Sequence, residues 1–229
     1  GYVFTPSVGR SGWRRRILRF VVEALYRIAL GRAHRVIFLN PDDQREFLDR
    51  GLVARERSVL LGGIGVDLKD WRYAPPVTEP ISFLLVGRLL REKGIVEYVA
   101  AARLVRDQYP QARFVLLGGL DSNSGGLGRA QVRAWGDEGL LEWPGHVDVR
   151  PWLERASVFV LPSYREGVPL STQEAMAMGR PVITTDVPGC RETVRDGING
   201  YLVPAHDAAA LADAMRRFLE NPERVMSMG

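Results

Sequence analysis

From residue 81 to residue 219, short apolar runs alternate with patterns typical of amphipathic helices. The apolar runs are expected to form strands over Ile81–Val86, Phe114–Leu117, Leu140–Trp143, Val158–Leu161, Val182–Thr184 and Tyr201–Val203. Strands and helices that alternate at this spacing are typical of a parallel sheet with right-handed crossovers and helices on both faces. Most strand runs are continuously apolar, as expected of strands buried on both faces. The sequence therefore predicts an α/β domain with a doubly wound parallel sheet.

The first third of the chain is organised differently. Its main feature is Trp13–Leu30, where a basic cluster leads into a helical repeat of apolar residues, and shorter strand and helix patterns follow. Residues 72–80, RYAPPVTEP, carry three of the 14 prolines among polar residues, which is typical of a linker. We predict a partial N-terminal domain over 1–71, a linker over 72–80 and the α/β domain over 81–229.

Composition narrows the class of protein. Hydrophobic residues make up 46% and charged residues 25%, which is an ordinary globular balance. A net charge of +4 is consistent with anionic ligands or a membrane surface and is too weak to demand nucleic acid. The single cysteine, Cys190, excludes an intramolecular disulfide and fits a reducing cytosol. No apolar run approaches the roughly 18 to 20 residues that span a bilayer.

The basic helix over Trp13–Leu30 has two interpretations. A basic amphipathic helix can lie on an anionic membrane, which would make the protein peripheral on the inner face of the membrane. The alternative is a helix that packs within its domain and keeps its arginines in water, and base rates favour it.

The stretch Val158–Pro181 is the first candidate site. A strand is followed by a loop with Glu166, and a helical pattern then begins at Ser171. Such an order places a helix N-terminus, which favours anions, at the carboxyl edge of a parallel sheet, where open α/β sheets bind ligands. Ser171 to Glu174 matches the capping box S-x-x-E, so Glu174 has a structural role available as well as a binding one. Glu166 has no such structural role in the sequence.

The second candidate is GRLLREKG, residues 87–94, between a strand and a helix. Gly87 allows a close turn, and Arg88 and Lys93 place two cations at the same sheet edge, where they suit a diphosphate. The alternative is that both cations are solvated and pair with Glu92 and Glu97. The segment is neither a Walker loop nor a dinucleotide-binding fingerprint.

Other chemistries find little support. The three histidines have no shared spacing and no Cys/His cluster exists, so a metal site is not expected. No GxSxG nucleophile signature is present. The glycine-rich loop Gly118–Gly128 could cradle a phosphate, but its polar residues favour a solvent loop. Cys190 is expected to be a small buried residue near the cleft.

Three motifs together resemble the family-4 retaining glycosyltransferases. They are Gly87-Arg88 followed by Lys93-Gly94, the pair Glu166 and Glu174 inside REGVPLSTQEAMAMGRPVITTDVPGCRE, and DGINGYLV near the end of the chain. Such enzymes have the GT-B fold, in which two Rossmann-like domains face each other across a cleft. Within the family, YREGVP, TTDVPGCRE and GVDL are most similar to enzymes of O-antigen, capsule and lipid-linked glycan biosynthesis.

The resemblance implies a nucleotide-sugar site around these motifs. Arg88 and Lys93 would hold the donor diphosphate and stabilise the leaving group, and Glu174 would bind the ribose. Glu166 would bind hydroxyls of the transferred sugar, and we count it with the two cations as catalytic. The segment at His146 and Val147 would lie against the base. Further donor contacts are expected at Gly63, Gly65, Gly87, Gly167, Val168, Pro169 and Leu170.

The resemblance also implies an activity: transfer of a sugar, with retention, from a nucleotide-diphosphate donor, commonly UDP-linked, to a glycan or polyprenyl-diphosphate-linked acceptor, without a metal or other cofactor. Residues 1–71 would be the end of the acceptor-side domain, so the chain alone is expected to bind donor without transfer. The expected location is the cytoplasm. The alternatives are a nucleotide-sugar-binding module without catalysis and a GT-B sugar-nucleotide epimerase, which would need clustered acid and base residues.

Overall fold

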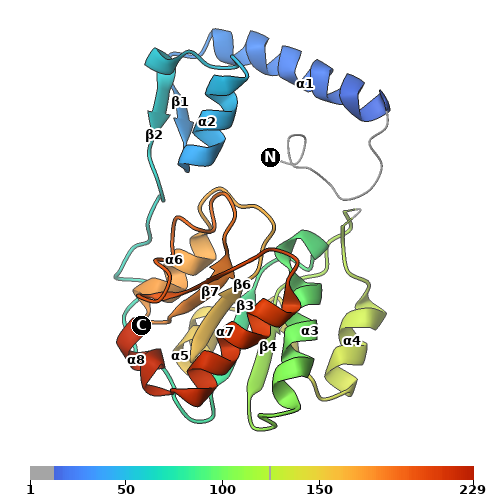
Figure 1. Ribbon diagram of the computed structural model, residues 1–229, viewed down its shortest axis with the longest axis vertical. Helices are drawn as coiled ribbons and strands as arrows, with labels where there is room; N and C mark the ends of the chain where they lie inside the picture. The colour runs from blue at the N-terminus through green and yellow to red at the C-terminus, as the bar shows by residue number, and fades with distance from the viewer. Residues whose placement is uncertain (1–12, 124) are drawn as a thin grey trace. The chain divides into compact units, whose positions relative to one another are not determined.

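The computed structural model describes residues 13–123 and 125–229, and its contacts divide the chain into two compact units, Gly1–Gly63 and Ile64–Gly229 (Figure 1). The first unit contains α1 (Trp13–Gly31), β1 (Val36–Phe38), α2 (Pro41–Asp49), the 3-10 turn η1 (Arg55–Arg57) and β2 (Ser58–Leu60). β1 and β2 pair in parallel. Asn40 caps α2 by accepting a hydrogen bond from the backbone N–H of Asp43, and Pro41 occupies the first helical position, which its fixed φ suits.

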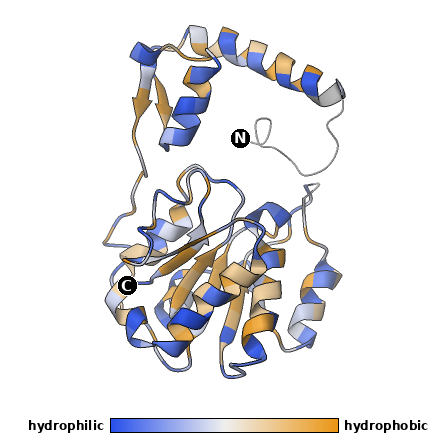
Figure 2. Cartoon of the chain, viewed as in Figure 1, coloured by the Kyte–Doolittle hydropathy of each residue, from blue (hydrophilic) through white to orange (hydrophobic). Residues whose placement is uncertain are grey.

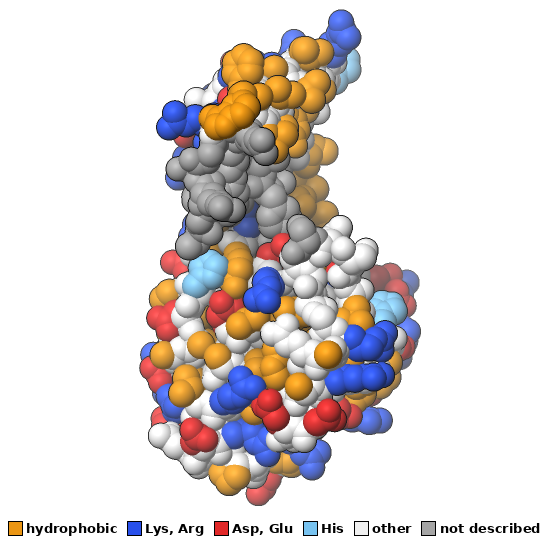
Figure 3. Space-filling model, turned by 90° about the vertical axis from the view of Figure 1, so that its right-hand side faces the viewer, with side chains coloured by type: hydrophobic (Ala, Val, Ile, Leu, Met, Phe, Trp, Pro, Cys, Tyr) orange, Lys and Arg blue, Asp and Glu red, His pale blue; other side chains and the backbone are white. Residues whose placement is uncertain are grey.

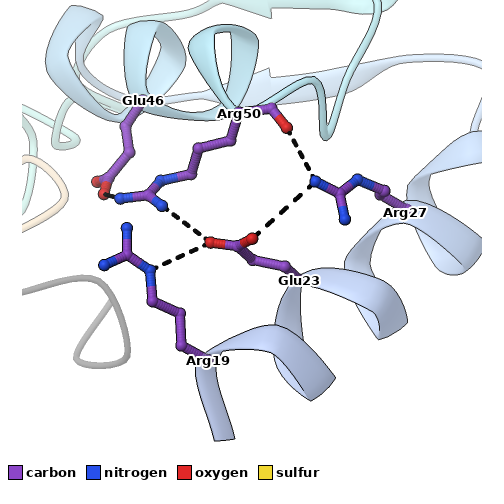
Figure 4. A network of polar contacts seen from close by, with 5 residues as sticks. All are labelled: Arg19, Glu23, Arg27, Glu46 and Arg50. Atoms are coloured by element: carbon purple, nitrogen blue, oxygen red, sulfur yellow. Dashed lines mark hydrogen bonds and ion pairs between the residues drawn. The ribbon is translucent and has the colours of Figure 1, made fainter. Parts of the chain in front are cut away.

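The helix α1 packs on α2 through its charged side. Glu23 accepts hydrogen bonds from Arg19 at 3.2 Å and from Arg50 at 2.8 Å, and Arg50 also reaches Glu46 (Figure 4). Apolar side chains of α1 lie outward, and Phe20 is 69% exposed (Figure 3). The helix therefore packs within its unit, and membrane association remains a prediction.

The second unit is built on one parallel sheet of six strands in the order β5-β4-β3-β6-β7-β8. The strands are β3 (Ser82–Val86), β4 (Arg113–Leu117), β5 (Glu142–Gly145), β6 (Val158–Leu161), β7 (Val182–Thr185) and β8 (Gly200–Val203). The helical elements are η2 (Arg91–Lys93), α3 (Ile95–Arg106), α4 (Arg129–Asp137), α5 (Arg150–Arg155), α6 (Leu170–Ala177), α7 (Ala208–Glu220) and α8 (Glu223–Met228). The α/β fold predicted from the sequence is confirmed.

Two apolar layers cover the two faces of this sheet. Phe83 and Val160 belong to the layer that α3, α4 and α7 complete, whereas Leu84 and Phe159, their neighbours in sequence, belong to the layer with α5 and α6. The central strands β3 and β6 are accordingly largely apolar in Figure 2, and the polar residue in them is Ser82, which begins β3. Because neighbouring strand residues point to opposite faces, the continuous apolar runs are explained by a sheet buried on both sides.

The predicted linker 72–80 contains no helix or strand and is tied to the body of the second unit. Arg180, which is 1% exposed, donates to the carbonyl of Ala74 at 2.5 Å, and its Nε donates to that of Leu153 at 2.7 Å. The contact boundary after Gly63 precedes this segment. The boundaries 1–71, 72–80 and 81–229 therefore stay a prediction.

Two local predictions differ from the structure. The fifth strand is Glu142–Gly145 and not Leu140–Trp143, because the buried Leu140 and Leu141 fill the core from the preceding turn. Helix α8 was not expected from the sequence. It is a short helix whose buried Val225 packs into the core layer of α7.

Candidate functional site

The sheet has a topological switch point between β3 and β6. The chain leaves β3 toward β4 on one side, and β6 lies on the other side of β3. At such a point the chain leaves the two strands in opposite directions, and doubly wound folds bind ligands there, at the carboxyl edge of the sheet. The two loops here are residues 87–94, which are one candidate segment, and residues 162–169, which lie within the other candidate segment, Val158–Pro181.

Gly94 lets these loops meet. Its φ is +69°, and a Cβ at this position would lie 2.0 Å from the carbonyl oxygen of Pro162. Only glycine tolerates both the left-handed backbone and this close approach. Beside it, the backbone N–H of Tyr164 donates to the carbonyl of Glu92 at 2.9 Å.

Lys93 and Glu166 form an ion pair across the two loops. Lys93 Nζ lies 2.5 Å from Glu166 Oε1, and the two side chains are 20% and 15% exposed. A partly buried pair is weakly screened, so it joins the loops more firmly than a surface pair would. The sequence prediction that Glu166 has no structural partner is therefore wrong. Local sequence patterns could not reveal this partner, because Lys93 and Glu166 are 73 residues apart.

The loop that carries Glu166 is supported by the segment after β7. Glu166 N–H donates to the carbonyl of Pro188 at 3.1 Å. Gly189 has φ +82°, and a Cβ there would lie 2.2 Å from the carbonyl oxygens of Glu166 and Gly167. The neighbouring Cys190 is fully buried, and burial raises the pKa of its thiol to about 11. It is an inert packing residue, as expected from the sequence.

Glu174 differs from Glu166 in its surroundings. Helix α6 begins at Leu170, its N-cap is Pro169, and no side chain caps it. The predicted capping box is therefore wrong, because Ser171 lies inside the helix rather than at its N-cap. Among the described residues the Glu174 carboxylate has no hydrogen-bond or ion-pair partner, and partial burial raises its pKa.

Arg88 lies at the same sheet edge but is more exposed. Its side chain is 64% exposed and donates to Asp121 at 3.0 Å. Gly87 precedes it, and a Cβ at Gly87 would lie 3.7 Å from the Lys93 side chain. Neither cation makes the predicted alternative pair with Glu97, since Glu97 accepts its hydrogen bond from Tyr164.

The remaining predicted positions are distributed along the same edge. Gly167 and Leu170 are exposed, Val168 is half-buried and Pro169 is buried. Val147 follows β5 and is 36% exposed, next to a cavity of about 410 Å³ whose lining includes Gly119, Arg133 and His146.

The structure ties Gly65, but not Gly63, to helix α6. The backbone N–H of Gly65 donates to Gln173 Oε1 of α6 at 2.9 Å, which brings Gly65 to the start of that helix. Gly63 lies in the first unit, so its place at this site stays a prediction.

Sequence reasoning missed Tyr164 and His206. Tyr164 Oη donates to Glu97 Oε1 at 2.8 Å, and the ring of His206 lies 3.8 Å from the Tyr164 ring, centroid to centroid. His206 Nδ1 is 3.7 Å from Glu97 Oε1. Three segments far apart in the sequence supply these residues, so no local pattern could have revealed the cluster.

The described residues offer neither a metal site nor a membrane-spanning helix. No cluster of three His, Cys, Asp or Glu side chains in residues 13–123 and 125–229 could hold a metal ion. No helix in the same ranges is long and apolar enough to cross a membrane.

Comparison with known proteins places the chain in a family. The model of the family "Glycosyl transferases group 1" matches residues 80–221, more than half of the chain. A relative from Campylobacter jejuni, N,N'-diacetylbacillosaminyl-diphospho-undecaprenol alpha-1,3-N-acetylgalactosaminyltransferase, is 29% identical over 227 residues, covering 92% of this chain and 58% of its own length.

Solved structures agree with this match. Sucrose-phosphate synthase from Thermosynechococcus elongatus superposes with a TM-score of 0.77 at 31% identity, covering 96% of this chain and 57% of that one. Anabaena HepE in complex with UDP-glucose has a TM-score of 0.73 at 19% identity, covering 90% of this chain and 60% of that one, and shows the shared fold. The chain thus spans somewhat more than half of each of these relatives. Its second unit is the Rossmann-like domain of a GT-B fold, and the chain belongs to the group 1 glycosyltransferases.

Proposed function

We propose that this chain is the donor-binding part of a retaining glycosyltransferase that moves a sugar from a nucleotide diphosphate to a glycan or a lipid-linked acceptor. The observation that carries the proposal is the Lys93–Glu166 pair at the topological switch point, in which Glu166 lies four residues before the start of α6. A cation for phosphate, a carboxylate for sugar hydroxyls and a helix N-terminus for negative charge are what a nucleotide-sugar needs at one place.

In this proposal the cations act on the leaving group. When the bond between the sugar C1 and the diphosphate oxygen breaks, negative charge develops on the diphosphate. Lys93, Arg88 and the first-turn N–H groups of α6 are held where that charge appears, and preorganised charge of this kind lowers the barrier. We propose that these groups stabilise the leaving diphosphate without a metal ion or other cofactor.

The carboxylates act in recognition. Glu174 accepts hydrogen bonds from the ribose hydroxyls, and Glu166 accepts them from the transferred sugar. Backbone groups around Gly167 and Val168 contact the sugar and phosphate, and the base lies against Val147. A carboxylate whose pKa is raised by burial, as that of Glu174 is, gains most from new hydrogen-bond donors.

The proton of the acceptor goes to the departing phosphate. The new bond joins the acceptor oxygen to C1 on the face that the diphosphate leaves, so the anomeric configuration is retained. The leaving diphosphate oxygen takes the acceptor's proton, so the step needs no basic side chain of the protein.

We propose UDP and a lipid-linked acceptor because of the proteins to which this chain is similar. The Campylobacter jejuni relative is named for transfer to a diphospho-undecaprenol carrier, and HepE was solved with UDP-glucose. A lipid-linked acceptor would place the enzyme in the cytoplasm, peripheral on the inner face of the membrane. Transfer is proposed to require the acceptor-side part of the longer relatives, so the chain by itself binds donor with little or no transfer.

Calorimetry with UDP and with UDP-sugars tests the proposal. Saturable binding that is lost in Lys93→Ala and weakened in Glu174→Ala is expected. Absence of binding by the folded protein, or binding that both substitutions leave unchanged, would overturn it. A donor screen on the whole enzyme with a lipid-linked acceptor then separates transfer from binding alone.

A further inference from the structure

We propose that Glu97 and Tyr164 are positioning residues of the donor site: their hydrogen bond holds the loop that carries Glu166 in place while Lys93 is drawn from Glu166 toward the donor diphosphate. This inference rests on the proposed function and adds a specific device to it.

Three contacts that join the segment around the start of α3 to the Glu166 loop matter here. Lys93 Nζ lies 2.5 Å from Glu166 Oε1, Tyr164 N–H donates to the carbonyl of Glu92 at 2.9 Å, and Tyr164 Oη donates to Glu97 Oε1 at 2.8 Å. Tyr164 therefore makes two of the three contacts and stands two residues before Glu166. Fixing Tyr164 fixes the backbone from which Glu166 projects.

Donor binding acts on only one of these contacts. A diphosphate competes with Glu166 for the ammonium of Lys93, and sugar hydroxyls compete with Lys93 for the carboxylate of Glu166. Both partners of the ion pair thus gain new partners when the donor arrives. The Tyr164–Glu97 hydrogen bond involves neither group and can persist, so it continues to join the loop to α3.

The surroundings of Glu97 favour a firm bond. Its side chain is 16% exposed, and its Oε2 is buried without a hydrogen-bond partner among the described residues. The carboxylate lies in the first turn of α3, where the helix dipole favours a negative charge. A buried carboxylate with one oxygen unpaired depends strongly on the donor at the other oxygen.

The hydroxyl of Tyr164 is held as a donor. Burial, and next the bond to Glu97, raise the pKa of Tyr164, so its proton stays on at any working pH. His206 packs over the Tyr164 ring at a centroid distance of 3.8 Å and comes from the β8–α7 connection. The ring is therefore fixed by two elements outside its own loop.

The test compares Tyr164→Phe with Tyr109→Phe. Tyr109 also directs its hydroxyl to a glutamate, Glu220, at 3.5 Å, but it lies after the end of α3, at the opposite edge of the sheet from the Glu166 loop. The protein is titrated with UDP and with UDP-glucose and UDP-N-acetylglucosamine, and the ratio of the sugar-nucleotide affinity to the UDP affinity is recorded. Hydrogen exchange of the amides of residues 163–168 is followed in parallel.

A positioning role predicts a selective loss. Tyr164→Phe should lower the affinity for the better sugar-nucleotide by about tenfold and that for UDP by less than about twofold, because losing the bond to the charged Glu97 loosens the loop from which Glu166 binds the sugar. Amides 163–168 should exchange faster. Glu97→Ala should have the same effects as Tyr164→Phe. Glu97→Gln should restore part of the ratio of sugar-nucleotide affinity to UDP affinity, because its amide oxygen still accepts the hydrogen bond. Tyr109→Phe should behave like the wild type.

Two outcomes would overturn the inference. If wild-type protein binds both ligands and Tyr164→Phe leaves their affinity ratio unchanged, or lowers both affinities equally, the bond is only structural. If the wild-type protein binds neither UDP nor the sugar-nucleotides, the proposed function itself fails and the inference falls with it. Faster exchange without a change in the ratio counts against the inference.

Discussion

Glu166 and Glu174, the two carboxylates of the candidate site, lie on one loop–helix segment, but only Glu166 is paired with a cation. Glu166 is held against Lys93 at 2.5 Å. Glu174 has no such partner among the described residues, and burial raises its pKa. The charge of a paired carboxylate is already balanced, so the carboxylate must give up its partner to bind a ligand. A partly buried carboxylate without a partner destabilises the fold, and a ligand that donates hydrogen bonds to it relieves that cost. In the proposed function this difference gives them separate tasks: Glu166 would be coupled to the diphosphate through Lys93, and Glu174 would be a preorganised acceptor.

Removing the shared cation should give the largest effect. Lys93→Ala takes a charge from the diphosphate and leaves Glu166 uncompensated beside it, so UDP affinity should fall by about a hundredfold. Calorimetry measures it. Arg103→Ala, which breaks the exposed pair with Glu138, is the matched control and should change UDP affinity by less than about twofold. A loss of less than about threefold in Lys93→Ala would show that the pair does not face the donor.

Neutralising Glu166 should separate the sugar from the nucleotide. Glu166→Gln frees Lys93, so UDP should bind as well as before or up to about threefold more tightly, while the sugar-nucleotide should bind about tenfold less tightly because a charged acceptor is lost. Parallel titrations of the two ligands record the ratio. Equal losses for both ligands would contradict the separate tasks.

Neutralising Glu174 should raise stability and lower affinity together. Because burial raises its pKa, the folded protein binds this proton more tightly than the unfolded chain does, so stability falls as the pH rises through the window between the usual and the raised pKa and stays lower above it. At pH 7, Glu174→Gln should therefore raise Tm, by no more than about 2 °C, and weaken UDP binding by about fivefold. A lower Tm, measured by calorimetric scanning, would indicate a hidden partner.

The smallest expected effect is on pH dependence. Only the ionised Glu174 accepts both ribose hydroxyls, so UDP affinity of the wild type should decline on acidification sooner than an ordinary glutamate would cause. Glu174→Gln should lose this component, while titration of the UDP phosphate is common to both proteins. The difference between the two affinity–pH curves is the measurement, and parallel curves would exclude Glu174 from the binding surface.

Much of the fold followed from local patterns because each strand and helix carries its own signal. The run Val158–Leu161 is a strand with the predicted limits, and Asp207 caps α7 by accepting a hydrogen bond from the backbone N–H of Ala210, the kind of cap that an aspartate before a helix signals. The predicted start of α6 at Ser171 is wrong because two sequence signals compete there. Ser171 to Glu174 matches a capping box, but Pro169 has φ −66° and ψ 127°, which suits a residue just before a helix, and α6 begins directly after it.

The candidate site residues were chosen from the sequence, but the side chains that they contact in the structure could not be predicted. Lys93 and Glu166 are 73 residues apart, and Tyr164 and Glu97 are 67 apart. Which side chains meet between the loops after β3 and β6 depends on the order of the strands and on close backbone approaches such as that of Gly94 to Pro162. A sequence pattern predicts that both loops reach the same sheet edge, but not which atoms pair.

A crystal structure with a bound UDP-sugar tests the central claim most directly. The account predicts the diphosphate at the switch point between β3 and β6, with Lys93 Nζ about 3 Å from a phosphate oxygen. It predicts a Lys93–Glu166 distance longer than the present 2.5 Å, and Tyr164 still bonded to Glu97. A nucleotide bound elsewhere, or a diphosphate at the switch point that leaves the Lys93–Glu166 pair untouched, would contradict it.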